Sequence, residues 1–405
     1  MPGQIQRPIK AIGVLTGGGD VPGLNAAIKT LVYRARSMDI SVMGILSGWE
    51  GITYLDRQRE RSELVFKEDD PATWNGSYLL PLNMLNTRTI DRRGGTILHS
   101  TRTNPAKTRV GDLPPNLKYY GEGREPNERV DLTKEVLANI EFLGLDGLVV
   151  IGGDDTLSYG AVLAAQGVPV WGIPKTMDND VPGTDYCIGF QTAINRASEF
   201  ITRLRSTAGS HSETVLFRLF GRDAGFTAYE TAVVSWADRL LIPEVPVDID
   251  TLADLVMGDR HNPQNYSVVV LSEGANLGVP VPNVGLPDAY GHYKKANVAE
   301  FLADELARRL PKVRFLPVDL TYILRSGEPD VYDKHMAIYY ANLIMSTMAD
   351  GVYGVMAAHR DGDFITTDVP SKSLSPRRVD PIDYHPTRYR PRFEHIRGDY
   401  RPVEG

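Results

Sequence analysis

Several features are missing from this sequence of 405 residues, and each absence narrows the protein's class. One cysteine, Cys187, allows no internal disulfide and no cysteine-rich metal site, which fits a reducing compartment. Lys and Arg number 44 against 51 Asp and Glu, so the net charge of −7 argues against a general nucleic-acid or anionic-membrane binder. No apolar run approaches the roughly 18 residues that span a bilayer, and residues 1–10 show no apolar signal core. We therefore expect a cytoplasmic protein with neither membrane nor nucleic-acid partners.

What the chain does have is a repeated alternation of short apolar runs with amphipathic stretches. With 42% apolar residues it can build a substantial core. The expected strands are 11–15, 41–46, 147–151, 168–173, 214–219 and 266–272. The expected helices are 24–36, 132–143, 158–165, 190–206, 227–234 and 296–310. Strands that alternate with helices indicate βαβ units, so we predict an α/β protein with two largely parallel sheets.

Three segments lack this periodicity. Residues 104–130 are rich in Pro, Gly, Asn and charge and predict a long surface excursion, and residues 274–294 form a Gly/Pro-rich loop. From Pro376 onward there are five prolines, seven arginines and three tyrosines without a repeat. A mobile tail and an arm that packs on another subunit both remain open for this last segment, because aromatic residues favour a docked segment. A nucleic-acid-binding tail is the least favoured interpretation.

A cluster of glycines, Thr16-Gly17-Gly18-Gly19-Asp20, follows the first expected strand and precedes the first helix. Consecutive glycines at such a place let backbone N–H groups approach an anion, and the helix adds its positive end. The cluster lacks the Gly-Lys-Ser/Thr of a Walker loop and does not match GxGxxG. Taken alone, it is equally compatible with a structural turn.

Two further polar clusters follow expected strands. Gly152-Gly153-Asp154-Asp155-Thr156 places adjacent carboxylates where parallel sheets bind ligands, and a helix cap alone explains only one of them. Pro174-Lys175-Thr176-Met177-Asp178-Asn179-Asp180 carries more opposite charges than an ordinary turn. Lys175 can grip a phosphate, Asp178 can take a proton from a hydroxyl, and Asp180 can orient it or help to hold a metal.

Together these clusters place glycine N–H groups, a lysine and the four carboxylates of Asp154, Asp155, Asp178 and Asp180 at strand ends of one sheet. The combination suits Mg²⁺-assisted transfer of a phosphoryl group to a hydroxyl, in which the protein supplies positioning and charge neutralisation.

Longer stretches of sequence make a family resemblance specific. The chain resembles the phosphofructokinase family, in particular its pyrophosphate-dependent branch, over roughly residues 10–360. The matching stretches are VLTGGGDVPGLNAAIK (14–29), GGTILHSTR (94–102), VVIGGDDT (149–156), GIPKTMDND (172–180), GFQTAINRASEFITRLRSTAGSH (189–211), FGRDAG (220–225) and SEGAN (272–276). NAD kinases also carry a motif that resembles GGDG[ST], but they lack the GGGDVPGLN and KTMDND motifs found in this chain.

The resemblance implies roles for residues on the donor side. Gly18 and Gly19 resemble the loop that holds the phosphoryl donor, with Asp155, Thr156 and Lys175 beside it. Arg102 matches the arginine that bridges donor and acceptor in the transition state. Asp154 resembles the aspartate that binds Mg²⁺.

On the acceptor side, the resemblance implies that Thr176, Asp178 and Asp180 form a sugar-binding loop in which Asp178 is the base for the 1-hydroxyl. Arg222 matches the arginine beside the transferred group. The remaining implied sugar contacts are Phe220 and Gly221, which flank the sugar with Arg222, then Glu273 for its hydroxyls, and Tyr322 and Arg325 for its distal phosphate.

The choice of donor depends on position 155. The ATP-using members of the family resemble GGDG at this site. In this chain Asp155 takes the place of the last glycine and puts a carboxylate where the α-phosphate of ATP would continue into ribose. Pyrophosphate ends before that point. We therefore expect reversible phosphoryl transfer from pyrophosphate to fructose 6-phosphate, yielding fructose 1,6-bisphosphate and phosphate. An ATP-dependent enzyme of the same fold is the alternative.

One departure from the family's pattern concerns the acceptor. Two residues after His211 the family has an arginine that reaches the sugar phosphate of a neighbouring subunit, but here the residue is Glu213. A carboxylate does not bind phosphate, so sedoheptulose 7-phosphate is an alternative acceptor. Fructose 6-phosphate, held by Arg218, Arg325 or a lysine, is favoured. A catalytically inactive phosphosugar sensor is the alternative of another class.

The family's architecture implies two lobes with the active site in the cleft between them. We expect a larger lobe over 1–188 plus about 327–365, a smaller lobe over 189–326, and an arm over 366–405. The resemblance also implies a homodimer or homotetramer. Because Tyr33 replaces one of the two basic residues that bind effectors in short bacterial relatives, while Lys29 keeps the other, we expect no allosteric control of that kind.

Overall fold

The structure is a computed structural model that describes residues 2–5, 7–261, 263, 265–284 and 294–395. It divides into two compact units. The first comprises Met1–Thr192, Gly285–Lys294 and Arg325–Pro376, and the second comprises Ala193–Val284, Lys295–Leu324 and Arg377–Gly405. The chain thus leaves the first unit and later returns to it.

The first unit is built on a seven-stranded sheet with the order β17-β16-β8-β7-β2-β3-β4. The strands are β2 (Ala11–Thr16), β3 (Ser41–Ile45), β4 (Leu79–Leu82), β7 (Gly147–Gly152), β8 (Val170–Pro174), β16 (Val355–Arg360) and β17 (Asp363–Asp368). The five inner strands are parallel, whereas β4 and β17 pair antiparallel at the two edges. The loops after β2, β7 and β8 therefore emerge at one edge of the sheet.

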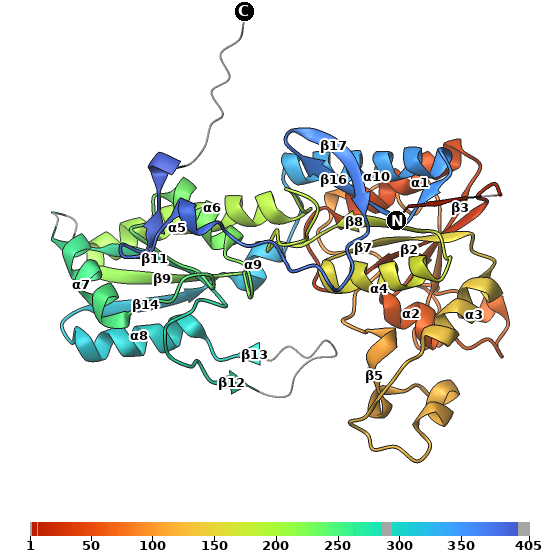
Figure 1. Ribbon diagram of the computed structural model, residues 1–405, viewed down its shortest axis with the longest axis horizontal. Helices are drawn as coiled ribbons and strands as arrows, with labels where there is room; N and C mark the ends of the chain where they lie inside the picture. The colour runs from red at the N-terminus through yellow and green to blue at the C-terminus, as the bar shows by residue number, and fades with distance from the viewer. Residues whose placement is uncertain (1, 6, 262, 264, 285–293, 396–405) are drawn as a thin grey trace, which may run out of the picture. The chain divides into compact units, whose positions relative to one another are not determined.

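Helices cover both faces of this sheet (Figure 1). One face carries α1 (Leu24–Ser37) and α10 (Val331–Ala349), which pack against each other. The other carries α2 (Trp49–Tyr54), α3 (Thr133–Leu143) and α4 (Asp154–Ala165). The core on this second face joins Trp49, Val136 and Leu157 to strand residues. Because both faces are covered, the inner strands consist of continuous apolar runs.

The second unit has a four-stranded parallel sheet with the order β10-β11-β9-β14. Its strands are β9 (Glu213–Leu219), β10 (Arg239–Leu241), β11 (Ser267–Ser272) and β14 (Arg314–Asp319). Helix α6 (Phe226–Ser235) packs on one face, and α7 (Ile249–Arg260) and α8 (Val298–Arg309) pack on the other (Figure 1). Two further helices are α5 (Phe190–His211) and α9 (Thr321–Arg325).

The excursion predicted for residues 104–130 has more local structure than its composition indicated. Strands β5 (Thr108–Arg109) and β6 (Arg129–Val130) pair antiparallel, and short 3₁₀ turns lie between them. A small apolar cluster of Leu113, Leu117, Val130 and Leu132 supports the excursion. Within the loop predicted for 274–294, β12 (Asn283–Val284) pairs with β13 (Lys294–Lys295), and residues 285–293 lie outside the described part.

The described part of the C-terminal segment packs on the chain's own second unit. Its predicted start, residue 366, lies inside β17, and residues 377–395 pack on the second unit. Tyr384 is fully buried and donates its hydroxyl hydrogen to the carbonyl of Leu240. Tyr389 is also buried, and its hydroxyl accepts a hydrogen bond from the Asp248 N–H. Residues 396–405 of the expected arm lie outside the described part.

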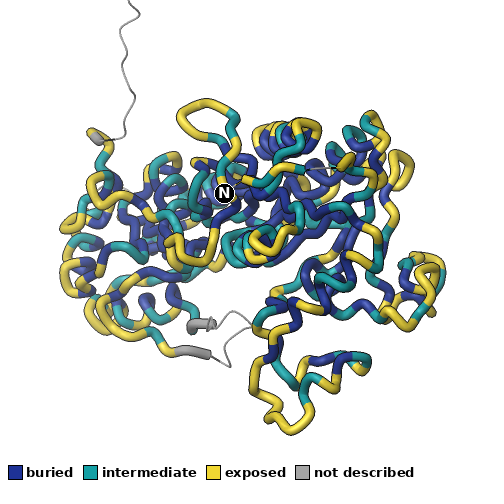
Figure 2. Tube along the Cα trace, turned by 45° about the vertical axis from the view of Figure 1, so that its right-hand side comes forward, coloured by how far each residue is buried: buried dark blue, intermediate teal, exposed yellow. Residues whose placement is uncertain are grey.

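The α/β fold with largely parallel sheets is confirmed. Buried residues follow the inner strands, coloured dark blue in Figure 2, as continuous apolar runs require. Every predicted strand and helix is present, with ends that differ by a few residues, whereas β4, β10, β14, β16, β17, α2, α7, α9, α10 and the two-residue strands were not predicted. Among the described helices, none combines the length and apolar character that a membrane crossing requires.

Candidate active site

The glycine loop after β2 is held against its neighbours by backbone hydrogen bonds. The Gly17 N–H donates to the carbonyl of Ile151, and the Gly18 N–H donates to the carbonyl of Thr101. Gly18 has φ = 81°, a left-handed conformation that glycine adopts at no steric cost. A Cβ on Gly17 would collide with the side chain of Thr156, which is itself buried. Glycines are needed here because β2 and α4 approach each other closely.

Lys175 connects the loop after β8 to this glycine loop. Its side chain is 3% exposed, and its Nζ donates a hydrogen bond of 2.6 Å to the carbonyl oxygen of Gly19. Desolvation by burial, together with the positive charges of Arg325 and Arg102, lowers the pKa of Lys175 to about 8. A cation in this position is therefore poorly compensated by the protein and favours an anionic ligand.

A cavity of about 460 Å³ opens over the glycine loop. Its lining consists of Gly18, Gly19, Asp20, Gly95, Thr96, His99, Ser100, Thr101, Arg102 and Arg325. Arg102 and Arg325 add two guanidinium groups to the charge of Lys175. Arg325 also forms an ion pair of 3.6 Å with Asp20. The cavity thus combines a glycine loop with basic side chains, and guanidinium and ammonium groups are the side chains that bind phosphate.

The first turn of α4 carries both adjacent carboxylates, Asp154 and Asp155. Asp155 forms an ion pair of 3.9 Å with Lys372, which comes from the segment after β17. In the part of the chain that the structure describes, no group of three or more His, Cys, Asp or Glu residues is placed to enclose a metal. Mg²⁺ is usually held by one or two carboxylates together with substrate phosphates and water. The half-buried Asp154 at this sheet edge fits such a site.

The loop that carries Thr176, Asp178 and Asp180 is shaped by Asn179. That residue has φ = 54°, which asparagine tolerates better than most side chains. Its amide nitrogen donates to the carbonyl of Asp185, and its amide oxygen accepts from the N–H of Cys187. Asp178 is half-buried, and its N–H donates to the Thr176 hydroxyl. The buried amide therefore holds a turn that presents an aspartate on either side of it.

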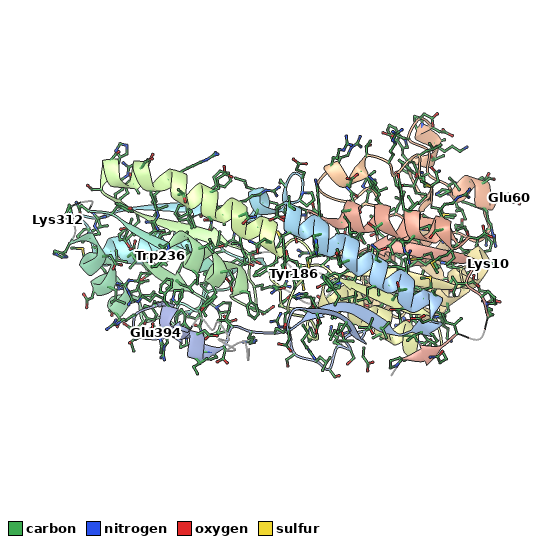
Figure 3. The ribbon with its side chains drawn as sticks, turned by 90° about the horizontal axis from the view of Figure 1, so that it is seen from above. Lys10, Glu60, Tyr186, Trp236, Lys312 and Glu394 are labelled. Atoms are coloured by element: carbon green, nitrogen blue, oxygen red, sulfur yellow. The ribbon has the colours of Figure 1, made fainter. Side chains whose placement is uncertain are left out.

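A buried carboxylate anchors the segment that follows this loop. Asp333, in the first turn of α10, is fully buried and accepts hydrogen bonds from the N–H groups of Gly189 and Thr192. It also accepts from the hydroxyls of Thr192 and Tyr186. Tyr186 lies beside the start of α10 in Figure 3. The start of α5 is thus tied to α10 by one side chain.

In the second unit, a further set of predicted site residues meets at the carboxyl end of the sheet. Phe220, Gly221 and Arg222 follow β9, and Glu273 follows β11. The Glu273 N–H donates to the carbonyl of Leu219, and the Gly274 N–H donates to that of Gly221. Gly221 has φ = 118°, and a Cβ on Gly274 would collide with the Arg222 carbonyl. The two loops are therefore packed backbone to backbone.

The predicted pair of Tyr322 and Arg325 is divided between the two units. Both residues belong to α9, but Tyr322 belongs to the second unit and is 74% exposed. Arg325 belongs to the first unit, where it lines the glycine-loop cavity. Arg325 therefore lies with the predicted donor-binding residues.

Glu213 occupies the opposite end of its sheet from Glu273. It is the first residue of β9, it is buried, and it forms an ion pair of 3.1 Å with Arg314. Arg218, at the other end of β9, forms ion pairs with Glu273 and Asp319. The charged side chains at the two ends of β9 are therefore both paired within the second unit.

Several cavity residues were not singled out from the sequence. One of them is His99, which lines the cavity with φ = 54°. Its carbonyl accepts from the Thr16 hydroxyl, which also lies 3.1 Å from the hydroxyl of Thr96. The Ser100 hydroxyl donates to the Gly18 carbonyl. The GGTILHSTR stretch carried a signal for this segment, but it pointed only to its last residue, Arg102.

Comparison with known proteins gives a consistent result. Residues 11–348 match the family described as Phosphofructokinase. The chain is 34% identical to the pyrophosphate--fructose 6-phosphate 1-phosphotransferase of Amycolatopsis methanolica, over 92% of this chain and 97% of that protein. It is also 34% identical to ATP-dependent 6-phosphofructokinase 3 of Streptomyces coelicolor, over 87% of this chain and 91% of that protein.

A solved structure resembles the fold. The crystal structure of a pyrophosphate-dependent phosphofructokinase from Marinobacter aquaeolei has a TM-score of 0.71. The match covers 95% of this chain and 89% of the chain in that crystal structure, at 16% sequence identity. At that identity the likeness extends to the fold alone.

Proposed function

The chain belongs to the phosphofructokinase family and is a phosphotransferase, and on that premise we propose that it moves a phosphoryl group from pyrophosphate to the 1-hydroxyl of fructose 6-phosphate. The products are fructose 1,6-bisphosphate and phosphate. A pyrophosphate donor gives a small driving force, so both directions are expected to proceed. A place in sugar-phosphate breakdown or synthesis fits this reaction.

The observation that carries the proposal is the set of cations around the glycine loop. The Lys175 ammonium is bonded to Gly19, and the Arg102 and Arg325 side chains line the same cavity. Three cations around a glycine loop suit a compact polyanion and stabilise the charge that develops on the phosphoryl group during its transfer. In this arrangement, Gly18, Gly19 and Lys175 hold the donor, and Arg102 bridges donor and acceptor.

The acceptor's proton is assigned to the loop after β8. Asp178 takes the proton from the 1-hydroxyl as its oxygen attacks the phosphorus, while the bond from that phosphorus to the bridging oxygen breaks. The displaced phosphate leaves with the bridging oxygen. Thr176 and Asp180 orient the sugar, and in the second unit Phe220, Gly221, Arg222, Glu273 and Tyr322 are the proposed sugar contacts.

Asp154 is the residue that would hold Mg²⁺, and the ion would neutralise charge on the pyrophosphate. The neighbouring Asp155 is the residue that we assign to donor choice, because its carboxylate stands on the first turn of α4 and would repel an α-phosphate that continues into ribose.

ATP is the second candidate donor, because relatives named for ATP and for pyrophosphate match this chain at the same 34% identity. Sedoheptulose 7-phosphate stays the alternative acceptor, because Glu213 stands where the family has an arginine that reaches the sugar phosphate of a neighbouring subunit. Within this chain Glu213 is buried and pairs with Arg314 at the amino end of β9.

The test is an initial-rate measurement with fructose 6-phosphate and Mg²⁺, in which pyrophosphate and ATP are compared at equal concentration. Turnover with pyrophosphate and little with ATP is the expected result. Turnover with ATP alone would refute the donor assignment. Absence of turnover with either donor, together with retained binding of fructose 6-phosphate, would favour a sensor.

The Asp178→Asn variant is the matched control for the chemical step. Its side chain keeps its size but accepts no proton, so kcat is expected to fall by about 100-fold to 10,000-fold. The KM for fructose 6-phosphate should change little, because the amide still fits the loop. A kcat near that of the wild type would remove Asp178 from the role of base.

A further inference from the structure

Arg218 lies at the carboxyl end of β9, a central strand of the four-stranded sheet. Its side chain is only 14% exposed. One terminal nitrogen donates to Asp319 Oδ2 at 2.5 Å, and the other donates to Glu273 Oε2 at 3.3 Å. Asp319 is its direct partner in the register with β14, and Glu273 follows β11 on the other side. The guanidinium therefore bridges carboxylates from both neighbouring strands.

The carboxylate of Asp319 also accepts hydrogen bonds from the start of α9. Its Oδ1 accepts hydrogen bonds from the N–H and the hydroxyl of Thr321, the first residue of α9. Desolvation raises the pKa of Asp319, but the Thr321 hydrogen bonds and the charge of Arg218 lower it overall. The Arg218 carbonyl also accepts from the N–H of Leu320. Arg218 thus contacts the segment that starts α9, the helix that carries Tyr322.

Charge decides what this arginine can do. One guanidinium faces two carboxylates, so the group of three carries a net negative charge and is a poor site for a phosphate. Without the guanidinium, the carboxylates of Glu273 and Asp319 would lose their common cation and repel each other. Arg218 is consequently suited to hold Glu273 in place and unsuited to grip the phosphate of the sugar.

We propose that Arg218 is a positioning residue for the acceptor sugar, which orients the Glu273 carboxylate and the start of α9 through its two ion pairs. The proposal rests on the proposed function, because it assumes that Glu273 binds hydroxyls of the sugar phosphate. It replaces the expectation that Arg218 holds the distal phosphate.

The first measurement compares Arg218→Met and Arg218→Lys with the wild type, using the KM for each substrate. Loss of the bridge should raise the KM for fructose 6-phosphate by about 10-fold to 100-fold, because small displacements of a binding group have effects of that size. The KM for pyrophosphate should stay within about 2-fold, since the donor residues belong to the other unit. Arg218→Lys keeps one charge and should recover part of the loss.

Arg239→Met is the matched control. Arg239 is a buried arginine of the same sheet that forms ion pairs with Asp259, and it starts β10. Its loss should lower thermal stability without a selective change in the KM for fructose 6-phosphate. If Arg239→Met raised that KM as much as Arg218→Met, the effect would be one of general stability, and the proposal would be wrong.

A double-mutant cycle with Glu273→Gln separates positioning from direct phosphate binding. If Arg218 acts through Glu273, Arg218→Met should add little to the KM once Glu273→Gln is present. Additive effects would mean that Arg218 contacts the sugar phosphate itself and would overturn the proposal. If Arg218→Met alone fails to fold, the cycle is run with Arg218→Lys, which keeps a cation between the carboxylates.

The proposed function and the role of Arg218 can be refuted separately. A wild-type protein that neither binds nor phosphorylates fructose 6-phosphate contradicts the proposed function. A wild-type protein that phosphorylates it, with an unchanged KM in Arg218→Met, contradicts only the assignment of Arg218.

Discussion

The Nζ of Lys175 donates a hydrogen bond to the carbonyl oxygen of Gly19 across 2.6 Å, joining the loops that follow β8 and β2. A carbonyl stabilises the ammonium but does not neutralise it. Arg325 and Arg102 add positive charge nearby, and burial removes the water that would screen it. Lys175 and the Gly19 loop therefore form a preorganised anion-binding site, and its affinity for an anion depends on whether Lys175 is protonated.

The first prediction concerns the pH dependence that follows from Lys175. Its pKa is lowered to about 8, so the charged form predominates below pH 8 and declines above it. We expect kcat/KM for pyrophosphate to fall as the pH rises through about 8, because the neutral amine no longer attracts the donor. The measurement is a pH profile of kcat/KM for pyrophosphate at saturating fructose 6-phosphate.

Lys175→Arg supplies the comparison for that profile. A guanidinium stays protonated over the whole range, so a decline that originates in Lys175 should disappear in this variant even if its activity is low. A decline that persists unchanged would show that pyrophosphate itself, or another group, is titrating.

The second prediction concerns Asp155 and the donor. Asp155→Gly removes the carboxylate from the first turn of α4. We expect kcat/KM for ATP to rise by about 10-fold or more relative to that for pyrophosphate, equivalent to ~1.4 kcal/mol of discrimination. The ratio is obtained from initial rates with both donors on the same preparation. Asp155→Asn, which keeps the size but loses the charge, distinguishes steric exclusion from electrostatic exclusion.

A third prediction follows from the ion pair of Asp155 with Lys372. The side chains lie 3.9 Å apart and Lys372 is 57% exposed, so the pair is weak by itself. Lys372→Ala should nevertheless raise the KM for pyrophosphate by about 2-fold to 5-fold at low salt, because the variant loses a cation beside Asp155, a residue of the proposed donor site. The effect should vanish at high ionic strength.

Lys334→Ala is the control for that variant. Lys334 pairs with Glu328 at 3.8 Å in the same unit and is no part of the proposed site. An equal change in KM in both variants would mean that the loss of any surface cation accounts for the result.

The fourth prediction concerns stability and Asp333. Asp333→Ala leaves the N–H groups of Gly189 and Thr192 buried without their acceptor. We expect a loss of about 2–4 kcal/mol in the free energy of unfolding, measured by urea denaturation. Asp333→Asn should cost less, because its one amide oxygen still accepts. Equal stability of Asp333→Ala and the wild type would contradict the anchoring role.

Much of the fold could be predicted because its inner strands are short apolar runs flanked by glycine or polar clusters. The run at 147–151 became β7 with one residue added. The helix α10 was missed because apolar side chains occur all around it, so that no stripe with helical spacing stands out. The strand β14 was missed because Pro317 interrupts it, which is tolerated since β14 lies at the edge of its sheet.

Site residues within local motifs could be predicted from the sequence, whereas those brought in from distant segments could not. Local motifs identified Gly18, Gly19 and Lys175, and the structure brings these residues together. The position of Arg325 at the glycine loop was not predictable, because α9 is separated from that loop along the chain by the strands of the second unit. Asn179 was overlooked because its contribution is a left-handed backbone conformation, which no side-chain motif records.

The order of the strands has a consequence for how the protein is made. In the first unit, β8 (Val170–Pro174) pairs with β16 (Val355–Arg360), so this contact joins segments that leave the ribosome far apart in time. The four strands of the second unit's sheet, β9, β10, β11 and β14, are synthesised entirely between them, but the segment 377–395 of that unit follows β17. During translation, one edge of the growing first sheet and the face of α1 that α10 covers thus stay exposed until α10 and β16 emerge. We expect nascent chains that stop before residue 331 to depend on chaperones and to aggregate readily, whereas chains that extend past residue 395 should not.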